Sequence, residues 1–265
     1  MELLKIPKEE LLNRLRKIKS LGWIHTNRSK NDGAVGNTLE DLLHIPENNL
    51  AIANTVDWEL KTQRKNTSSL ITLFHIDPQP RKPESCVANI LLPNYGWPHA
   101  LAGKCYPKGE MSFRATLSGD RFTNRGLRIN VNSADRKVEI IFDPKQVDLS
   151  EHGKWFKQVS KFHTGGASIL AYWDFDELHK KCVGKIRNTI FVIADSRKNV
   201  KGQEEFKYEK IILLQDFAFN NLLRGLISGA IFIDFDARTG HNHGTKFRIK
   251  QDNWPALFSK ISDVN

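Results

Sequence analysis

The chain has 265 residues, of which 40% are hydrophobic and 26% charged, so it can form one large domain or two closely associated lobes with a buried core. Forty Lys and Arg residues against thirty Asp and Glu residues give a formal net charge of +10. This charge favours polyanions such as nucleic acid and argues against an enzyme for small neutral ligands.

Membrane insertion and secretion are not expected. The sequence contains no apolar run of about 18 residues, the length that a membrane-spanning helix needs. Its first residues are too charged for a secretory signal. The three cysteines are scattered without metal-binding spacing and fit a reducing cytoplasm better than a disulfide framework.

The N-terminal part is predicted to begin with two helices. Leucine and isoleucine residues at helical spacing predict a first helix between Pro7 and Gly22. A short second helix is expected to begin with Asn37 or Thr38 as its N-cap, because Thr38 and Asp41 stand at the spacing of a capping box.

The rest of the chain is predicted to be rich in strands. β-Branched and apolar runs between turn-forming residues predict strands at 52–62, 69–74, 111–117, 127–131, 138–142, 168–173, 189–194 and 230–235. The strands within residues 111–142 are expected to form a meander, and the proline-rich residues 78–108 an extended connection. Helices are expected at 175–182 and 217–226. The fold class is therefore α/β, in the mixed α+β sense.

The strongest chemical pattern lies on the strand predicted at 52–62. Strand alternation in residues 56–61 (VDWELK) puts Asp57, Glu59 and Lys61 on one face. Carboxylates on such a face can hold Mg²⁺, and an ammonium group can orient water and stabilise charge on a phosphate. The pattern indicates metal-dependent phosphodiester hydrolysis. A solvated edge-strand face is the alternative interpretation of so short a motif.

A larger set of motifs resembles one nuclease family. These motifs are GNTLEDLL at 36–43, ENN at 47–49, WELKTQR at 58–64, TLF at 72–74 and HNHGTKFRI at 241–249. Together they are similar to the MvaI/BcnI family of type II restriction endonucleases, which are relatives of the nicking enzyme MutH in the PD-(D/E)XK superfamily. The resemblance implies a mixed β-sheet flanked by helices and two lobes around a DNA cleft. We place the catalytic lobe at 1–108 and the DNA-recognition lobe at 109–265.

The resemblance also implies a set of catalytic residues. Glu40 resembles the family's helix-borne acidic residue, and Glu59 with Lys61 resembles its E-x-K pair. The family places a metal-binding aspartate shortly before that glutamate, at a position where this chain has Asn54. Asparagine is a neutral and weaker ligand, so either Asp57 supplies the charge or the chain is an impaired form. The expected catalytic residues are Glu40, Asn54, Glu59 and Lys61, and the expected Mg²⁺ ligands are Asn54, Asp57 and Glu59.

Candidate DNA-reading residues cluster late in the chain. Residues 238–248 gather polar side chains around two glycines, and arginine, lysine and asparagine pair well with base edges. A zinc site at the His-x-His spacing is disfavoured because no further Cys or His cluster lies nearby. His75 resembles a residue that approaches the central base pair from the minor groove, with a structural histidine as the alternative. The DNA-binding candidates are His75, Arg64, Arg238, His241, Asn242, His243, Thr245, Lys246 and Arg248.

Several basic clusters are candidates for phosphate contacts. One of them contains Lys180 and Lys181, and another contains Lys185 and Arg187. A solvated charged face is the alternative for each cluster.

The patterns predict Mg²⁺-dependent hydrolysis of phosphodiester bonds, and the resemblance implies a type II endonuclease that cuts one bond per strand of double-stranded DNA within a short CC-N-GG-like site. The resemblance implies a monomer in a prokaryotic cytoplasm, with a cognate DNA methyltransferase but no stable complex with it; a homodimer stays open. Two other functions stay open as well. One is a MutH-like enzyme that nicks one strand, and the other is a DNA-binding module that does not cleave.

Overall fold

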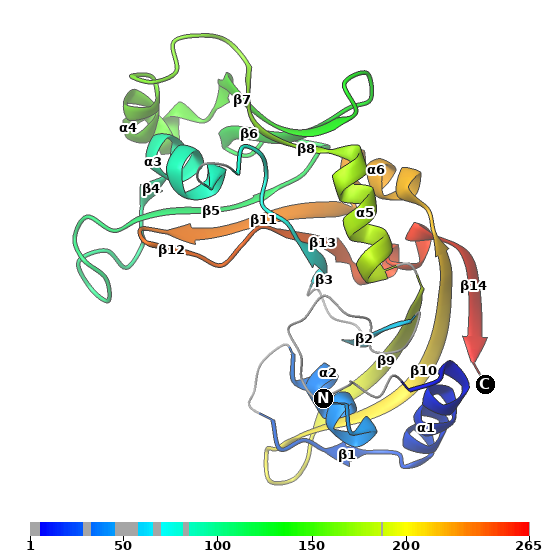
Figure 1. Ribbon diagram of the computed structural model, residues 1–265. Coiled ribbons are helices and arrows are strands. Elements are labelled where there is room, and N and C mark those ends of the chain that lie inside the picture. The colour runs from blue at the N-terminus through cyan, green and yellow to red at the C-terminus, as the bar shows by residue number, and fades with distance from the viewer. Residues whose placement is uncertain are drawn as a thin grey trace. The chain divides into compact units, whose positions relative to one another are not determined.

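The computed structural model describes residues 6–28, 33–45, 58–65, 70–81, 85–186 and 188–264 (Figure 1). The chain forms two compact units, each assembled from segments far apart in sequence. Unit 1 comprises Met1–Ile71, Lys180–Phe219 and Lys250–Asn265, and unit 2 comprises Thr72–His179 and Asn220–Ile249. The functional division into lobes 1–108 and 109–265 stays a prediction. Among the described residues, no helix has both the length and the apolar character needed to cross a membrane.

The described part of unit 1 is built on a five-stranded mixed sheet. Its strands β2 and β9 are parallel, whereas the other pairs are antiparallel. The order is β1 (Ile24–His25), β10 (Glu204–Phe217), β9 (Thr189–Lys198) and β2 (Glu59–Arg64), with β14 (Phe258–Val264) paired to β10.

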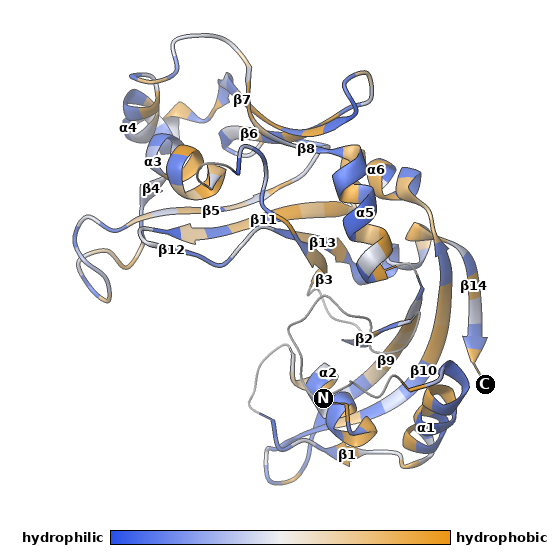
Figure 2. Ribbon diagram, viewed as in Figure 1, coloured by the Kyte–Doolittle hydropathy of each residue, from blue (hydrophilic) through white to orange (hydrophobic). Residues whose placement is uncertain are grey.

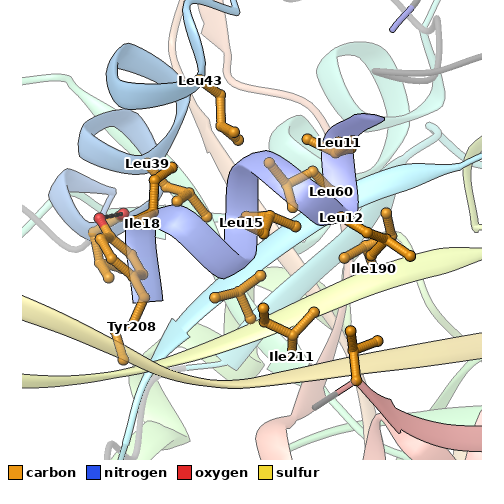
Figure 3. Close-up of a cluster of buried hydrophobic side chains, with 14 of the residues drawn as sticks. Leu11, Leu12, Leu15, Ile18, Leu39, Leu43, Leu60, Ile190, Tyr208 and Ile211 are labelled. Carbon is orange, nitrogen blue, oxygen red and sulfur yellow. Dashed lines mark hydrogen bonds between the residues drawn. The ribbon is translucent and has the colours of Figure 1, made fainter. Parts of the chain in front are cut away.

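Two helices pack on one face of this sheet. They are α1 (Lys8–Ser20) and α2 (Ala34–Leu43), and their leucines meet Leu60, Ile190 and Ile211 in a buried core (Figure 3). Burying one such leucine stabilises the fold by about 1.5–3 kcal/mol. Because strand side chains alternate, packing Leu60 into the core turns Glu59 and Lys61 to the opposite face of β2.

The first helix is confirmed, whereas the expected start of the second is wrong. α2 begins at Ala34, three or four residues before the expected cap at Asn37 or Thr38. The hydroxyl of Thr38 donates to the carbonyl of Ala34 at 2.7 Å inside the helix, so Thr38 does not cap it. The reason is apolar burial: Ala34 and Val35 are both buried, and they extend the core-facing stripe by almost one turn.

Unit 2 contains two sheets. One has the order β3 (Leu70–His75), β13 (Lys246–Lys250), β11 (Ile231–Arg238), β5 (Met111–Leu117) and β4 (Trp97–Pro98), with β12 (His241–Asn242) paired to β11. The other is antiparallel and consists of β6 (Arg125–Asn132), β7 (Lys137–Val147) and β8 (Ser168–Asp174). Hydrophobic residues run along the central strand β11, as they do along β9 in unit 1 (Figure 2).

Two expectations for this region are wrong in part. The strands of residues 111–142 do not form one meander, because β5 pairs with β11 and only β6 and β7 pair with each other. The proline-rich segment 78–108 is not extended throughout, because it contains η1 (Val87–Leu91), a π-helical turn, and α3 (Leu92–Tyr95). Both ends of each of these turns are buried, so local apolar packing decides the conformation.

The other helices agree with the sequence where it predicted one. The helices expected at 175–182 and 217–226 correspond to α5 (Phe175–Ile186) and α6 (Phe219–Ile227). The sequence did not predict α4 (Leu149–Val159), β10 or β14. Two short turns, η2 (Gln251–Asn253) and η3 (Pro255–Leu257), precede β14.

Candidate active site

Strand β2 carries an ion pair between a buried carboxylate and a half-buried lysine. Glu59 is 6% exposed, and its Oε1 lies 2.9 Å from Nζ of Lys61, whose side chain is 25% exposed. A carboxylate withdrawn from water costs several kcal/mol unless charge and hydrogen bonds compensate it. Lys61 compensates one oxygen of Glu59.

The second carboxylate oxygen of Glu59 is not compensated in this way. Among the described residues, Oε2 is buried and has no hydrogen-bond partner. An unpaired buried oxygen of this kind is destabilising in itself, and a hard carboxylate oxygen is the donor that divalent cations such as Mg²⁺ prefer. The described residues contain no group of three acidic, His or Cys side chains arranged to hold a metal. Asn54 and Asp57, the other expected ligands, lie outside the described residues.

Helix α2, which carries Glu40, packs against the same strand. It contacts β2 on the face that buries Leu60, opposite to Glu59 and Lys61, and Leu39, next to Glu40, is fully buried in that core. Glu40 itself is half-buried. The structure therefore packs the element that carries Glu40 against the element that carries Glu59, as the sequence led us to expect. A metal shared by the two carboxylates stays a prediction.

The neighbouring strand β9 places a second unpaired group beside Glu59. In the parallel register Glu59 faces Thr189, and the backbone N–H of Glu59 donates to the carbonyl of Asn188 at 2.9 Å. Register partners on parallel strands project from the same face of the sheet. Thr189 is 0% exposed, and its hydroxyl has no partner among the described residues. Sequence reasoning missed Thr189, because only the strand pairing brings it to Glu59.

Lys185 adds a second positive charge to this site. It lies in the last turn of α5, which leads directly into Asn188 and β9. Burial lowers the pKa of Lys185, the charge of Glu59 raises it, and the charges of Lys61 and Lys181 lower it. Lys185 is therefore close enough for the β2 ion pair to act on it. The sequence placed this lysine only in a basic cluster.

The expected arginines are held in ion pairs. In unit 1, Arg64 binds Glu204 through two bonds of 3.0 and 3.2 Å. In unit 2, Arg238 donates to the buried Glu110 at 3.0 Å, and Arg248 to Asp234 at 2.7 Å. Charge-assisted hydrogen bonds of this kind orient a guanidinium group firmly. The DNA contacts of these arginines stay predictions.

The remaining DNA-reading candidates gather on the sheet of unit 2. His241 and His243 are exposed, with ring centroids 4.2 Å apart. His75, at the end of β3, is exposed too, and its ring lies 3.9 Å from the position of a Cβ atom on Gly244. The other three differ, because Thr245 is buried while Asn242 and Lys246 are half-buried. The structure thus brings three histidines together, and their contact with bases stays a prediction.

Comparisons with known proteins agree with this fold. A family model described as "MvaI/BcnI restriction endonuclease family" matches residues 12–258. The chain is similar to the solved "Restriction endonuclease MvaI-cognate DNA substrate complex", with a TM-score of 0.76, 24% identity and coverage of 98% of this chain and 99% of that one. It is also similar to "Restriction endonuclease MvaI in the absence of DNA", with a TM-score of 0.55, 24% identity and coverage of 96% and 98%. A search of curated proteins found no match. The expected restriction-endonuclease-like α+β fold is confirmed.

The unpaired hydroxyl of Thr189 leads to a stability prediction. Thr189→Val keeps the side-chain shape and removes a buried hydroxyl that has no partner among the described residues. We expect the free energy of unfolding to rise by about 1 kcal/mol, measured by urea denaturation. The matched variant Thr189→Ser keeps the hydroxyl, loses a methyl group and should be less stable by about 1 kcal/mol. A Val variant that is less stable than the parent would contradict the conclusion that the buried hydroxyl of Thr189 lacks a partner.

Proposed function

Because the chain belongs to the MvaI/BcnI restriction endonuclease family, we propose that it is a type II restriction endonuclease that hydrolyses phosphodiester bonds in double-stranded DNA with Mg²⁺. The observation that carries this proposal is the buried Glu59–Lys61 pair, with one carboxylate oxygen lacking a partner among the described residues. A net charge of +10 suits the phosphate backbone. One of the similar solved structures is a complex with cognate DNA.

The finer features of the proposal follow the family resemblance. The target is a short CC-N-GG-like site, cut once in each strand by a monomer. Unit 1 contains Glu40, Glu59 and Lys61 and would supply catalysis, whereas unit 2 contains the three exposed histidines and would supply sequence recognition.

The donor set of the site fits a divalent cation. The unpartnered Oε2 of Glu59 is a hard anionic oxygen, and Asp57, Asn54 and Glu40 are the residues that would complete its ligand set. When bound, Mg²⁺ polarises the phosphoryl oxygen and lowers the pKa of a coordinated water. Asn54 contributes a neutral oxygen, so the charge at the metal depends on the acidic residues around it.

Several residues of the chain would each act on the phosphate or on the attacking water. The ammonium group of Lys61, oriented by Glu59, donates hydrogen bonds to the attacking water or to a non-bridging oxygen and stabilises the charge that develops there. Lys185 supplies a second ammonium group for the same phosphate. The hydroxyl of Thr189, beside Glu59 in the register and without a partner among the described residues, would hydrogen-bond the attacking water. Phe191, the register partner of Lys61, forms an apolar wall with Trp254 that keeps bulk water away.

The first functional prediction concerns the buried carboxylate. Glu59→Gln keeps the shape but removes the charge that orients Lys61 and would hold the metal. We expect single-turnover cleavage of DNA in saturating Mg²⁺ to slow by about 10²–10³-fold or more. Glu9→Gln, on the exposed face of α1, is the control and should cleave at the parental rate. Parental cleavage by Glu59→Gln would remove the E-x-K site from the mechanism.

The products of the same assay separate the three functions. With a supercoiled plasmid that carries the target, a restriction endonuclease yields linear fragments with fixed ends. A MutH-like nickase leaves open circles, and a binding module shifts the DNA in a gel without cutting it. Preference for CC-N-GG duplexes over random DNA tests the proposed specificity.

The second functional prediction concerns Asn54. If the neutral amide weakens metal binding, Asn54→Asp restores a carboxylate and raises the cleavage rate at limiting Mg²⁺. If Asp57 supplies the charge instead, Asp57→Ala abolishes cleavage, whereas Asn54→Asp changes it little. Rates measured across a Mg²⁺ titration distinguish these accounts. Neither account survives if both variants cleave like the parent at every Mg²⁺ concentration.

The third functional prediction concerns Lys185. Lys185→Ala should slow single-turnover cleavage by about 10–100-fold, because one of two ammonium groups at the phosphate is lost. Lys185→Arg retains the charge and should keep most of the activity. Lys19→Ala, at an exposed position in the last turn of α1, is the control and should cleave at the parental rate. Equal rates for Lys185→Ala and Lys19→Ala would show that Lys185 takes no part.

A further inference from the structure

The carboxylate of Asp77 holds the segment that links β12 to β13. Its Oδ2 accepts a hydrogen bond of 3.1 Å from the side-chain amide of Asn242. Its Oδ1 accepts two bonds from Thr245, at 2.9 Å from the backbone N–H and at 2.7 Å from the hydroxyl. One carboxylate thus receives three hydrogen bonds from a four-residue stretch, and bonds to an ionised acceptor are among the stronger ones in proteins.

Strand pairing fixes only the first residue of this stretch, because Asn242 ends β12 and pairs with Ala237 of β11. His243, Gly244 and Thr245 lie between two strands, and Gly244 has a φ of +80°, which favours glycine. The N–H of Gly244 donates to Oδ1 of Asn242 at 2.9 Å, so the amide held by Asp77 also fixes the turn. Asp77 and Asn242 therefore hold this stretch together with two backbone hydrogen bonds of 3.0 Å, from the N–H of His243 to the carbonyl of Asp236 and from the N–H of Ile76 to the carbonyl of Thr245.

The side chains of this segment differ in their exposure to solvent. Asn242 is half-buried and Thr245 is 1% exposed, and both bind Asp77. His241 and His243 alternate with Asn242 and are exposed. The residues that Asp77 holds are therefore the supports, and the histidines between them are the groups available to a partner.

Asp77 stands on a rigid platform. Its backbone carbonyl accepts a bond of 2.7 Å from Nε of Arg81, and Arg81 forms a two-bonded ion pair with Glu177. The carbonyl of the preceding residue, Ile76, accepts a bond of 3.1 Å from the indole of the buried Trp173. The carboxylate therefore has little freedom to move with the segment that it holds.

We propose that Asp77 is a specificity-determining positioning residue, which presets His241 and His243, next to His75, for hydrogen bonding to the base edges of double-stranded DNA. The inference rests on the proposed function as a DNA endonuclease. Base readout needs donors and acceptors placed to within a fraction of an ångström, so a loop that is fixed before binding discriminates better than one ordered by DNA. Asp77 acts through Asn242 and Thr245, without touching DNA.

The test compares variants that differ by single hydrogen bonds. Asp77→Asn turns one acceptor into a donor that faces other donors. Thr245→Val removes only the hydroxyl bond, whereas Thr245→Ser keeps it. Asp176→Asn, at an exposed position on α5, is the control for loss of a surface charge. Binding is measured with Ca²⁺ in place of Mg²⁺, by equilibrium capture and sequencing of duplexes randomised within a CC-N-GG frame.

We expect the ratio of affinities for the preferred and the random duplexes to fall about tenfold or more in Asp77→Asn, and less in Thr245→Val. Thr245→Ser and Asp176→Asn should stay within about twofold of the parent. The melting temperature should fall in Asp77→Asn because strong hydrogen bonds are lost, but affinity for random DNA should not change, and this separates positioning from a general loss of structure.

Three results would overturn the proposal. An unchanged ratio in Asp77→Asn, with a parent that does discriminate, refutes the positioning role and leaves the proposed function intact. A fall in both affinities together with the melting temperature shows that Asp77 serves stability alone. A parent without any sequence preference refutes the proposed function itself, and the inference with it.

Discussion

The parallel pairing of β2 with β9 is the constraint on which the candidate active site depends. It makes Thr189 the register partner of Glu59 and bonds the N–H of Glu59 to the carbonyl of Asn188. Helix α5, which ends shortly before Asn188, carries Lys185. The pairing is possible because α1 and α2 cover the opposite face of the sheet and bury Leu60 and its neighbours. A parallel pair is stable where its faces are covered. The core that buries Leu60 on one face of β2 therefore also directs Glu59 and Lys61 to the opposite face, where the candidate active site lies.

The candidate active site in unit 1 contains buried polar atoms that destabilise the fold. Glu59 Oε2 and the Thr189 hydroxyl are both buried without a partner among the described residues, and each such atom costs about 1–3 kcal/mol or more. A chain selected for stability alone would replace them by apolar groups of the same shape. Their presence next to two lysines agrees with a site that is completed by a cation and a phosphate.

In unit 2, acidic residues organise the polar side chains that face outward. Glu110 holds Arg238, Asp234 holds Arg248, and Asp77 holds the turn around Gly244. A basic protein that binds a polyanion still needs these carboxylates, because they fix the direction of each cationic or polar group before any partner arrives. The two units thus use acidic residues in different ways: Glu59 in unit 1 keeps a buried oxygen without a partner among the described residues, whereas the acids of unit 2 arrange donors.

The sequence by itself determined the family and many of the local elements, and it predicted the chemistry. Alternation on one strand identified Glu59 and Lys61, motif resemblance led to Glu40 and the family, and periodicity predicted α1, α5 and β9. Only the tertiary structure decided which strands pair, because register depends on long-range packing. For that reason β5 was assigned to the wrong neighbour, Thr189 was missed, and Lys185 was taken only for part of a basic cluster. Likewise, the sequence offered all polar residues of 238–248 as equal candidates for DNA contact. The structure distinguishes them, because Asn242 and Thr245 bind Asp77, whereas His241 and His243 are exposed.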